Sequence, residues 1–87
     1  MDKKDIFKVV NLVYDMGHSP IHTATLEYDS EYKYITVYIF DISKYQTDGR
    51  LSIADKRVIN DYTNKDMEWL IQWKERIERE NGKDKLH

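Results

Sequence analysis

The chain has 87 residues, a formal net charge of −2 and no cysteine. This length suits one domain with a single modest core. The absence of cysteine excludes disulfides and thiolate chemistry and is typical of an intracellular, cytoplasmic protein. No apolar run approaches the roughly 20 residues that span a bilayer, so no membrane partner is expected. The near-neutral charge argues against a general polyanion binder and against a nucleic-acid mimic.

The first predicted element is an amphipathic helix from Lys3 to Met16. Asp2 is its expected N-cap, because a carboxylate there accepts amide hydrogens of the first turn. The apolar positions that recur on one helical face are Ile6, Val9, Val10 and Val13. Gly17 can adopt the left-handed conformation that ends a helix, and Pro20 prevents continuation.

Two strands are expected next, Ile21 to Tyr28 and Tyr32 to Phe40, joined by a polar turn at residues 29–31. The second strand alternates with period two and therefore has two different faces. Its aliphatic face carries Ile35, Val37 and Ile39, and its aromatic face carries Tyr32, Tyr34, Thr36, Tyr38 and Phe40. Placing Tyr28 opposite Lys33 makes one side of the hairpin apolar, and this predicts the register.

A third strand is expected after Asp48-Gly49, which is a strong signal for a tight hairpin turn. It spans about Arg50 to Ala54, with Leu51 and Ile53 facing the core. Counting through the turn puts these two side chains on the aromatic side. A bulge near residues 41–43, or a wider loop, is therefore needed to return them to the core.

The chain ends in a second predicted helix, which starts at a capping box, Thr63 to Asp66, and runs to about Glu80. Its predicted inner stripe is Met67, Leu70, Ile71 and Ile77, with Trp73 beside it and Trp69 at the border. Val58 and Ile59 fit either a short strand or a helical turn. We therefore expect one α+β domain over residues 1–82, ordered helix, antiparallel sheet of two to three strands, helix (α-β-β-β-α), with 83–87 as a frayed tail.

Residues suited to catalysis or metal binding are sparse. His18 and His22 are four apart, but Pro20 between them prevents the helix that would present both to a metal. Asp41 and Ser43 are neighbours without a histidine placed to complete a nucleophilic arrangement. The chain has 3 glycines, too few and too scattered for a phosphate-binding loop. We expect no enzyme activity, no metal site and no cofactor.

The aromatic strand face is the candidate contact surface, because two helices cannot easily cover both faces of a three-stranded sheet. Tyrosine and tryptophan are enriched at interface hot spots, and the chain has 7 Tyr and 2 Trp. The predicted partner-binding residues are Tyr32, Tyr34, Tyr38, Phe40, Lys44, Tyr45 and Arg50. The expected partner is another protein, either from a host or a second copy of the chain.

The sequence leaves three functions open. The first is a small phage or mobile-element accessory protein that inhibits a host protein, such as a defence nuclease, by steric blockade; the AT-rich codon bias of its composition suits such a source. The second is a single-stranded nucleic-acid binder that stacks bases on the same aromatic face. The element order is similar in outline to the double-stranded-RNA-binding domain, without that family's lysine-rich start to the last helix. The third is a homodimerising structural subunit.

Overall fold

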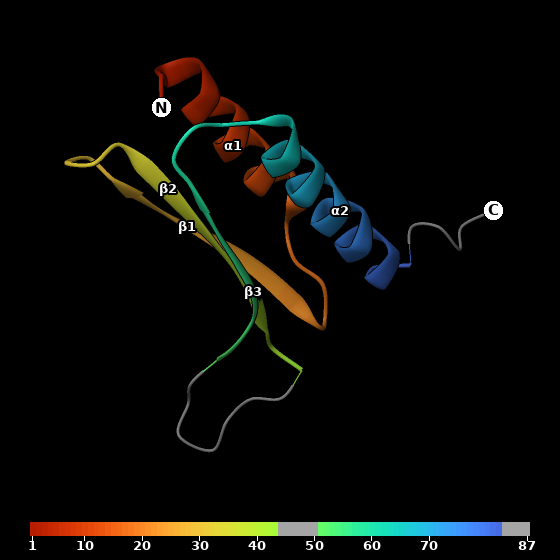
Figure 1. Cartoon of the computed structure of the whole chain (residues 1–87). Helices are drawn as coiled ribbons and strands as arrows, with labels where there is room; N and C mark the ends of the chain where they lie inside the picture. The colour runs from red at the N-terminus through yellow and green to blue at the C-terminus, as the bar shows by residue number, and fades with distance from the viewer. Residues whose placement is uncertain (44–50, 83–87) are drawn as a thin grey trace.

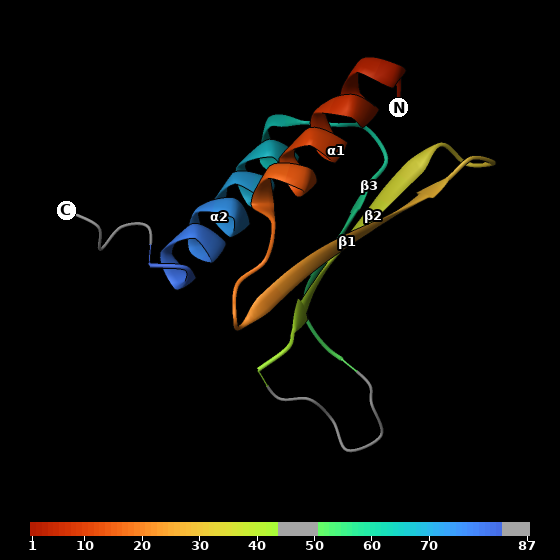
Figure 2. The ribbon, with the colours of Figure 1, turned by 180° about the vertical axis from the view of Figure 1, so that it is seen from behind.

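The computed structural model describes residues 1–43 and 51–82. The elements are α1 (Lys3–Met16), β1 (His22–Asp29), β2 (Tyr34–Asp41), β3 (Ser52–Ile59) and α2 (Asn64–Glu80). The strands form one antiparallel sheet in the order β1-β2-β3, and both helices lie on the same side of it (Figures 1 and 2). The predicted α+β order is confirmed, with three strands in the sheet.

The first helix begins and ends where its sequence signals predict. The Asp2 carboxylate accepts a hydrogen bond from the Asp5 amide at 2.9 Å, which satisfies one free donor of the first turn. At the other end Gly17 has a φ of +62°, a conformation that L side chains rarely adopt. Both termini of α1 are therefore set locally, before any tertiary contact is considered.

The second helix is tied to the sheet through its cap. Thr63 and Asp66 form the predicted capping box, with the Thr63 amide donating to Asp66 at 2.8 Å. The other Asp66 carboxylate oxygen accepts from the Arg57 guanidinium of β3 at 2.7 Å. Burial alone would raise the pKa of Asp66, but the bonds from Arg57 and Thr63 outweigh it and hold this pKa below its usual value.

The core lies between the helices and the aliphatic face of the sheet. Its buried members are Val9, Met16, Ile35, Val37, Ile39, Ile59, Leu70, Trp73 and Ile77. Burying each such side chain contributes about 1.5–3 kcal/mol. Within α2, Met67 is 36% exposed and Trp73 is 9% exposed. The predicted inner position of Met67 is therefore wrong, and Trp73 lies in the core stripe itself.

The β1–β2 hairpin is displaced by two residues from the predicted register. Tyr28 pairs with Ile35 instead of Lys33. The turn is longer than predicted because Lys33, at φ +59°, belongs to it and donates its amide to the Asp29 carbonyl at 2.8 Å. The Asp29 carboxylate also accepts from the Tyr32 amide at 2.8 Å. An even displacement leaves every side chain on its predicted face.

The third strand starts later and runs further than predicted, from Ser52 to Ile59 instead of from Arg50 to Ala54. Val58 and Ile59, whose conformation the sequence left open, are its last two residues. The strand therefore matches β1 and β2 in length, at 8 residues each.

A bulge interrupts the β2–β3 pairing at a different place from the one predicted. Ile39 pairs with Asp55 and Phe40 with Ile53, so Ala54 is the extra residue. Ile53 faces outward beside Phe40 and is 56% exposed. The bulge therefore does not lie at residues 41–43, and the predicted inward Ile53 is wrong, because Asp55 takes the inner position at this level. The alternative of a wider loop falls on residues 44–50, outside the described residues. Leu51, also predicted to face the core, is only half-buried.

Removing the cap of α2 tests this account of the fold. We expect Thr63→Ala to lower the free energy of unfolding by about 1 kcal/mol, since it removes the hydroxyl that accepts from the Asp66 amide. Urea denaturation measures the change. Thr25→Ala, on the exposed side of β1, is the control and should stay within about 0.5 kcal/mol of the parent. Equal losses in both variants would contradict the role of the cap.

Candidate functional site

Three of the predicted contact residues lie together on the outer face of the sheet, the face turned away from both helices (Figure 1). Tyr34, Tyr38 and Phe40 alternate with the buried aliphatic residues of β2 and are half-buried. Tyr32 lies in the β1–β2 turn and is 72% exposed. The predicted residues Lys44, Tyr45 and Arg50 lie outside the described residues.

The aromatic side chains of this face are ordered by contacts with one another and with β3. The rings of Tyr38 and Phe40 are stacked, with their centroids 5.8 Å apart and an interplanar angle of 17°. Lys56 pairs with Tyr38 across the sheet and places its ammonium 5.7 Å from the Tyr38 ring centroid. One face of each ring is therefore already in contact with the other ring.

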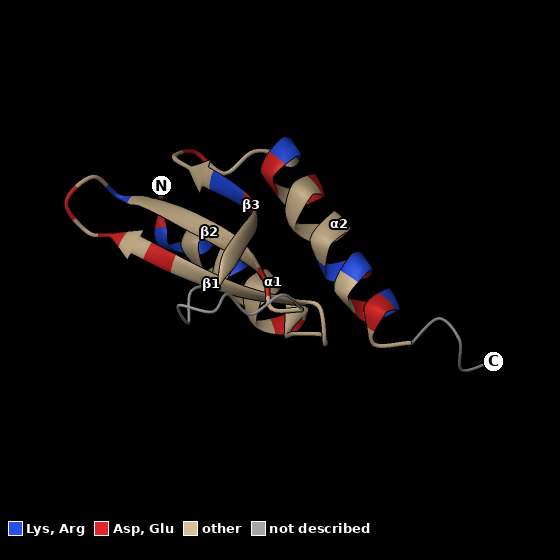
Figure 3. Cartoon of the chain, turned by 90° about the horizontal axis from the view of Figure 1, so that it is seen from below, with Lys and Arg blue, Asp and Glu red and all other residues tan. Residues whose placement is uncertain are grey.

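The surroundings of the aromatic pair are mostly uncharged, with one acidic and one basic residue among them. The outward residues inside the neighbouring strands are Thr23, Thr25 and Glu27 of β1 and Ile53, Lys56 and Val58 of β3. Ile53 and Val58 are 56% and 47% exposed. Figure 3 looks onto the sheet from this side and shows β2 mostly in the colour of uncharged residues, between acidic positions on β1 and basic positions on β3. Such a face suits a partner surface of mixed polarity.

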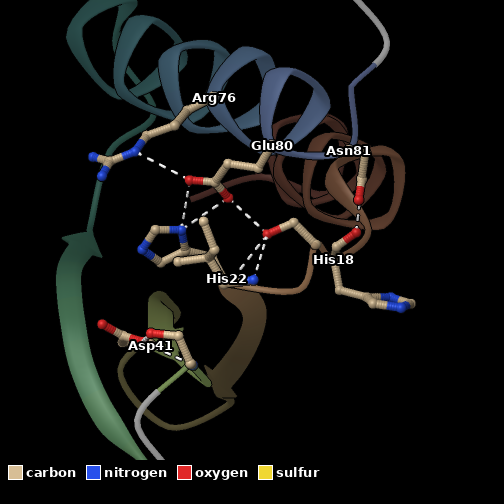
Figure 4. Close-up of polar contacts among 9 residues, drawn as sticks. His18, His22, Asp41, Arg76, Glu80 and Asn81 are labelled. Carbon is tan, nitrogen blue, oxygen red and sulfur yellow. Dashed lines mark hydrogen bonds and ion pairs between the residues drawn. The ribbon is translucent and has the colours of Figure 1, made fainter.

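A second group of residues, the Ser19–His22–Glu80 cluster, lies where the α1–β1 connection meets the end of α2 (Figure 4). The Ser19 hydroxyl donates to Glu80 at 2.6 Å, and His22 Nδ1 lies 2.8 Å from the same carboxylate. The Arg76 guanidinium adds a contact to Glu80 at 3.3 Å. Ser19 and His22 are 2% and 4% exposed, so the group is shielded from solvent.

The residue types of this cluster suggest a catalytic triad, but its connectivity is structural. The serine hydroxyl donates to Glu80 and accepts from the His22 amide at 2.9 Å, so it does not donate to the imidazole as a nucleophile would. Burial would raise the pKa of Glu80, but the hydrogen bonds from Ser19 and His22 and the nearby Arg76 hold it below its usual value. The cluster fastens the start of β1 to the end of α2.

Asp55 is the polar residue that the sequence analysis missed. It faces inward from β3, and a single carboxylate oxygen accepts from the indole N–H groups of Trp69 and Trp73 at 3.0 and 2.9 Å. Burial opposes ionisation, but the bonds from Trp73, the Lys56 amide and Trp69 lower the pKa of Asp55 below its usual value. Two features of the sequence could have indicated this contact. One is an acidic residue at an inward-facing strand position, and the other is a pair of tryptophans one helical turn apart.

A surface cleft of about 390 Å³ opens beside this carboxylate. Its lining residues are Asp55, Trp69, Gln72, Trp73, Glu75, Arg76 and Arg79. The Arg76 guanidinium lies over the Trp73 ring at 4.8 Å. Both carboxylate oxygens of Asp55 accept hydrogen bonds from protein donors. Of these groups, Asp55 joins β3 to α2 through the two indole N–H groups, and Arg76 makes its contacts with Trp73 and Glu80 within α2.

The residues from which no catalytic or metal site was expected either lie apart from one another or form hydrogen bonds with near neighbours in the sequence. Ser43 donates its hydroxyl and its amide to Asp41, at 2.6 and 2.9 Å, and so closes a local turn at the end of β2. His18 is exposed, whereas His22 is buried in its cluster. Within residues 1–43 and 51–82 there is no group of three or more acidic, histidine or cysteine side chains placed to hold a metal.

Comparison with protein families, with curated proteins and with solved structures finds no match to this chain. No helix in the described part of the chain is long and apolar enough to cross a membrane. Function is therefore inferred from the geometry of the outer sheet face.

The Ser19–His22–Glu80 cluster predicts a specific acid sensitivity. Because the folded-state pKa of Glu80 is lowered, its ionised form stabilises the protein above the ordinary carboxyl pKa of about 4.3. That stabilisation is lost as pH falls through the folded-state pKa. We expect Glu80→Gln to lower the free energy of unfolding at pH 7 by about 1–3 kcal/mol and to weaken its dependence on pH in the acid range.

Urea denaturation at pH values from 7 down to 2 measures both effects. The matched control is Glu78→Gln, since Glu78 forms a partly exposed i,i+4 pair with Lys74 at 3.1 Å. Its change should stay below about 0.5 kcal/mol at pH 7. An acid dependence for Glu80→Gln identical to that of the parent would show that this carboxylate is not linked to folding.

Proposed function

We propose that this chain is a non-enzymatic protein-binding domain whose contact surface is the outer sheet face, centred on Tyr34, Tyr38 and Phe40. One observation carries the proposal: both helices pack on the aliphatic face, so no helix or strand of the described chain covers the aromatic one. Half-buried aromatic side chains in a mostly uncharged surround are the residue types that anchor protein interfaces.

The order already present in this surface favours binding. Tyr38 and Phe40 are held by mutual stacking and by the neighbouring Lys56, so little side-chain entropy remains to be lost when a partner docks. Immobilising a flexible side chain at an interface costs about 0.5–1.5 kcal/mol. A preorganised aromatic pair avoids much of this cost, and the tyrosine hydroxyls keep a polar group for the rim of the contact.

Charge and ring geometry favour a protein over a nucleic acid. Phosphate binding needs several cations that track the backbone, whereas the described outward residues inside the strands offer Lys56 alone, balanced by Glu27. Stacking of a base needs a free ring face, and in the Tyr38–Phe40 pair one of the two faces of each ring is already taken by the other ring. The resemblance in element order to the double-stranded-RNA-binding domain does not strengthen the case for nucleic-acid binding. Arg57 is already bonded to Asp66 at the start of α2, so its charge is not available to a phosphate there.

The mode of action we propose is stoichiometric occlusion. A sheet face that docks on a host protein, such as a defence nuclease, blocks the surface beneath it without any chemistry. The composition is typical of an AT-rich genome, and this suits an accessory protein of a phage or mobile element that acts inside a low-GC bacterium.

The test starts with affinity capture from a nuclease-treated lysate of a low-GC Gram-positive bacterium, followed by titration calorimetry with the purified captured protein. We expect one-to-one binding by the parent chain. Tyr34→Ala combined with Tyr38→Ala should weaken this binding at least a hundredfold, because hot-spot truncations cost about 2 kcal/mol or more each. The far-ultraviolet circular dichroism of this double variant should match that of the parent.

The control is Met67→Ala, an exposed side chain of the helical layer, which should bind as the parent does. Equal loss in control and double variant, or unfolding of the double variant, would contradict the proposal. So would capture that depends on intact nucleic acid, or binding of a labelled single-stranded oligonucleotide that falls 10³-fold or more between about 50 and 200 mM salt.

A further inference from the structure

A small hollow beside the β1–β2 turn points to the chemistry of the partner. It has a volume of about 110 Å³ and is lined by Glu27, Tyr28, Asp29, Tyr34 and Thr36. We propose that this hollow receives the guanidinium group of an arginine side chain on the partner protein. The inference rests on the proposed function, because Tyr34 belongs both to the hollow and to the contact surface.

The sheet register brings four of the lining side chains together on the outer face. Glu27 of β1 pairs with Thr36 of β2, and Asp29 pairs with Tyr34. Residues that are directly opposite each other project to the same face of a sheet, and Tyr34 and Thr36 belong to the outward set of β2. Figure 3 shows acidic positions at this end of β1, next to the mostly uncharged β2.

Thr36 supplies the observation that points to a ligand. The residue is only 6% exposed, yet its hydroxyl forms no hydrogen bond with another residue of the described chain. Buried polar groups normally have a partner, and in the described chain every side-chain nitrogen or oxygen that is wholly cut off from solvent has one. The Thr36 hydroxyl is therefore reached through the hollow that it lines, where it can accept a hydrogen bond from a bound group.

The two carboxylates of the hollow have oxygens that are not yet bonded. Asp29 uses one oxygen, Oδ1, to accept from the amides of Glu31 and Tyr32 at 2.9 and 2.8 Å, and its other oxygen accepts from no described residue. Glu27 is exposed, and its carboxylate forms no ion pair or hydrogen bond with the described part of the chain. Two negative charges at one hollow favour a cation from the partner.

A guanidinium group fits these acceptors better than an ammonium group or a metal ion does. Its N–H donors lie in one plane, so they can reach carboxylate and hydroxyl oxygens together while the plane lies on the Tyr34 ring. The hollow has room for roughly four water-sized groups at ~30 Å³ each, which matches the carbon and three nitrogens of a guanidinium. Calcium needs about six to eight oxygen ligands, and among the described residues no acidic or histidine side chains gather in threes to hold a metal.

The contact itself makes a cation necessary. A partner that covers Tyr34 also covers the hollow, and it then removes water from Glu27, Asp29 and the Thr36 hydroxyl. Burying an unpaired charge is strongly unfavourable, so a partner without a cation at this point would bind poorly. The hollow therefore adds specificity to the aromatic contact, because it rejects partners that place a carboxylate or an apolar group there.

Titration with a small arginine derivative tests the hollow without the partner. In spectra of the isotope-labelled chain we expect N-acetyl-arginine amide to shift the amide signals of Glu27, Asp29, Tyr34 and Thr36 saturably in the millimolar range. N-acetyl-citrulline amide, a neutral isostere, is the control and should bind about tenfold more weakly or less, because it lacks the charge. Absence of saturable shifts, equal binding of both derivatives, or tighter binding of N-acetyl-lysine amide would overturn the proposal.

Matched variants test the acceptors. Glu27→Gln and Thr36→Val should each weaken binding of the arginine derivative about fivefold or more, because each removes an acceptor of the guanidinium. The controls are Glu31→Gln in the turn and Thr25→Val on the exposed side of β1, which should bind as the parent does. Circular dichroism checks that each variant is folded, and if Thr36→Val unfolds, the two glutamate variants decide. Equal losses in test variants and controls would contradict the proposal.

Binding of the captured partner separates this inference from the proposed function. Glu27→Gln should weaken that binding about tenfold or more and reduce its dependence on salt. If Tyr38→Ala, which lies outside the hollow, weakens the binding and Glu27→Gln does not, the contact surface stands and the arginine is excluded. If Tyr38→Ala has no effect while the arginine derivative still depends on Glu27, the proposed function fails and the guanidinium preference of the hollow stands.

Discussion

The contact between the helices and the aliphatic face of β2 is the interaction on which the rest of the structure depends. Ile35, Val37 and Ile39 are fully buried beneath both helices, and this places α1 and α2 on one side of the sheet. Within the described residues, neither a helix nor a strand lies over the opposite side (Figures 1 and 2). The exposed aromatic face is therefore a direct consequence of where the core forms.

Polar contacts fix the helical layer at defined points, and this explains why the polar clusters are structural. Arg57 and Asp66 join β3 to the start of α2, Asp55 holds two tryptophans of α2, and Glu80 joins the end of α2 to the start of β1. Each of these carboxylates has a pKa lowered by its donors. They orient α2 on the sheet, and the outer face carries mostly uncharged and aromatic residues, with Glu27 and Lys56 on its flanks.

The helices and the faces of β2 could be predicted from the sequence because their signals are local. Asp2, Gly17 and Thr63 set helix ends by bonds within a few residues, and period-two alternation assigns the faces of a strand. The hairpin register depended on the conformation of Lys33, a left-handed residue that is not glycine and gives no clear signal. The bulge at Ala54 accompanies the contact of Asp55 with two tryptophans of α2, and the position of a bulge set between segments this far apart is not encoded by a local pattern.

Chemical-shift mapping with the captured partner tests the central claim most directly. In a spectrum of the isotope-labelled chain, the account predicts that partner binding shifts the signals of the outward residues, above all Tyr34, Tyr38, Phe40 and Lys56. The signals of the Asp55–Trp73 cleft and of the inner stripe of α2 should stay in place. Shifts confined to that cleft or to the helical layer, with the outer face unchanged, would contradict the account.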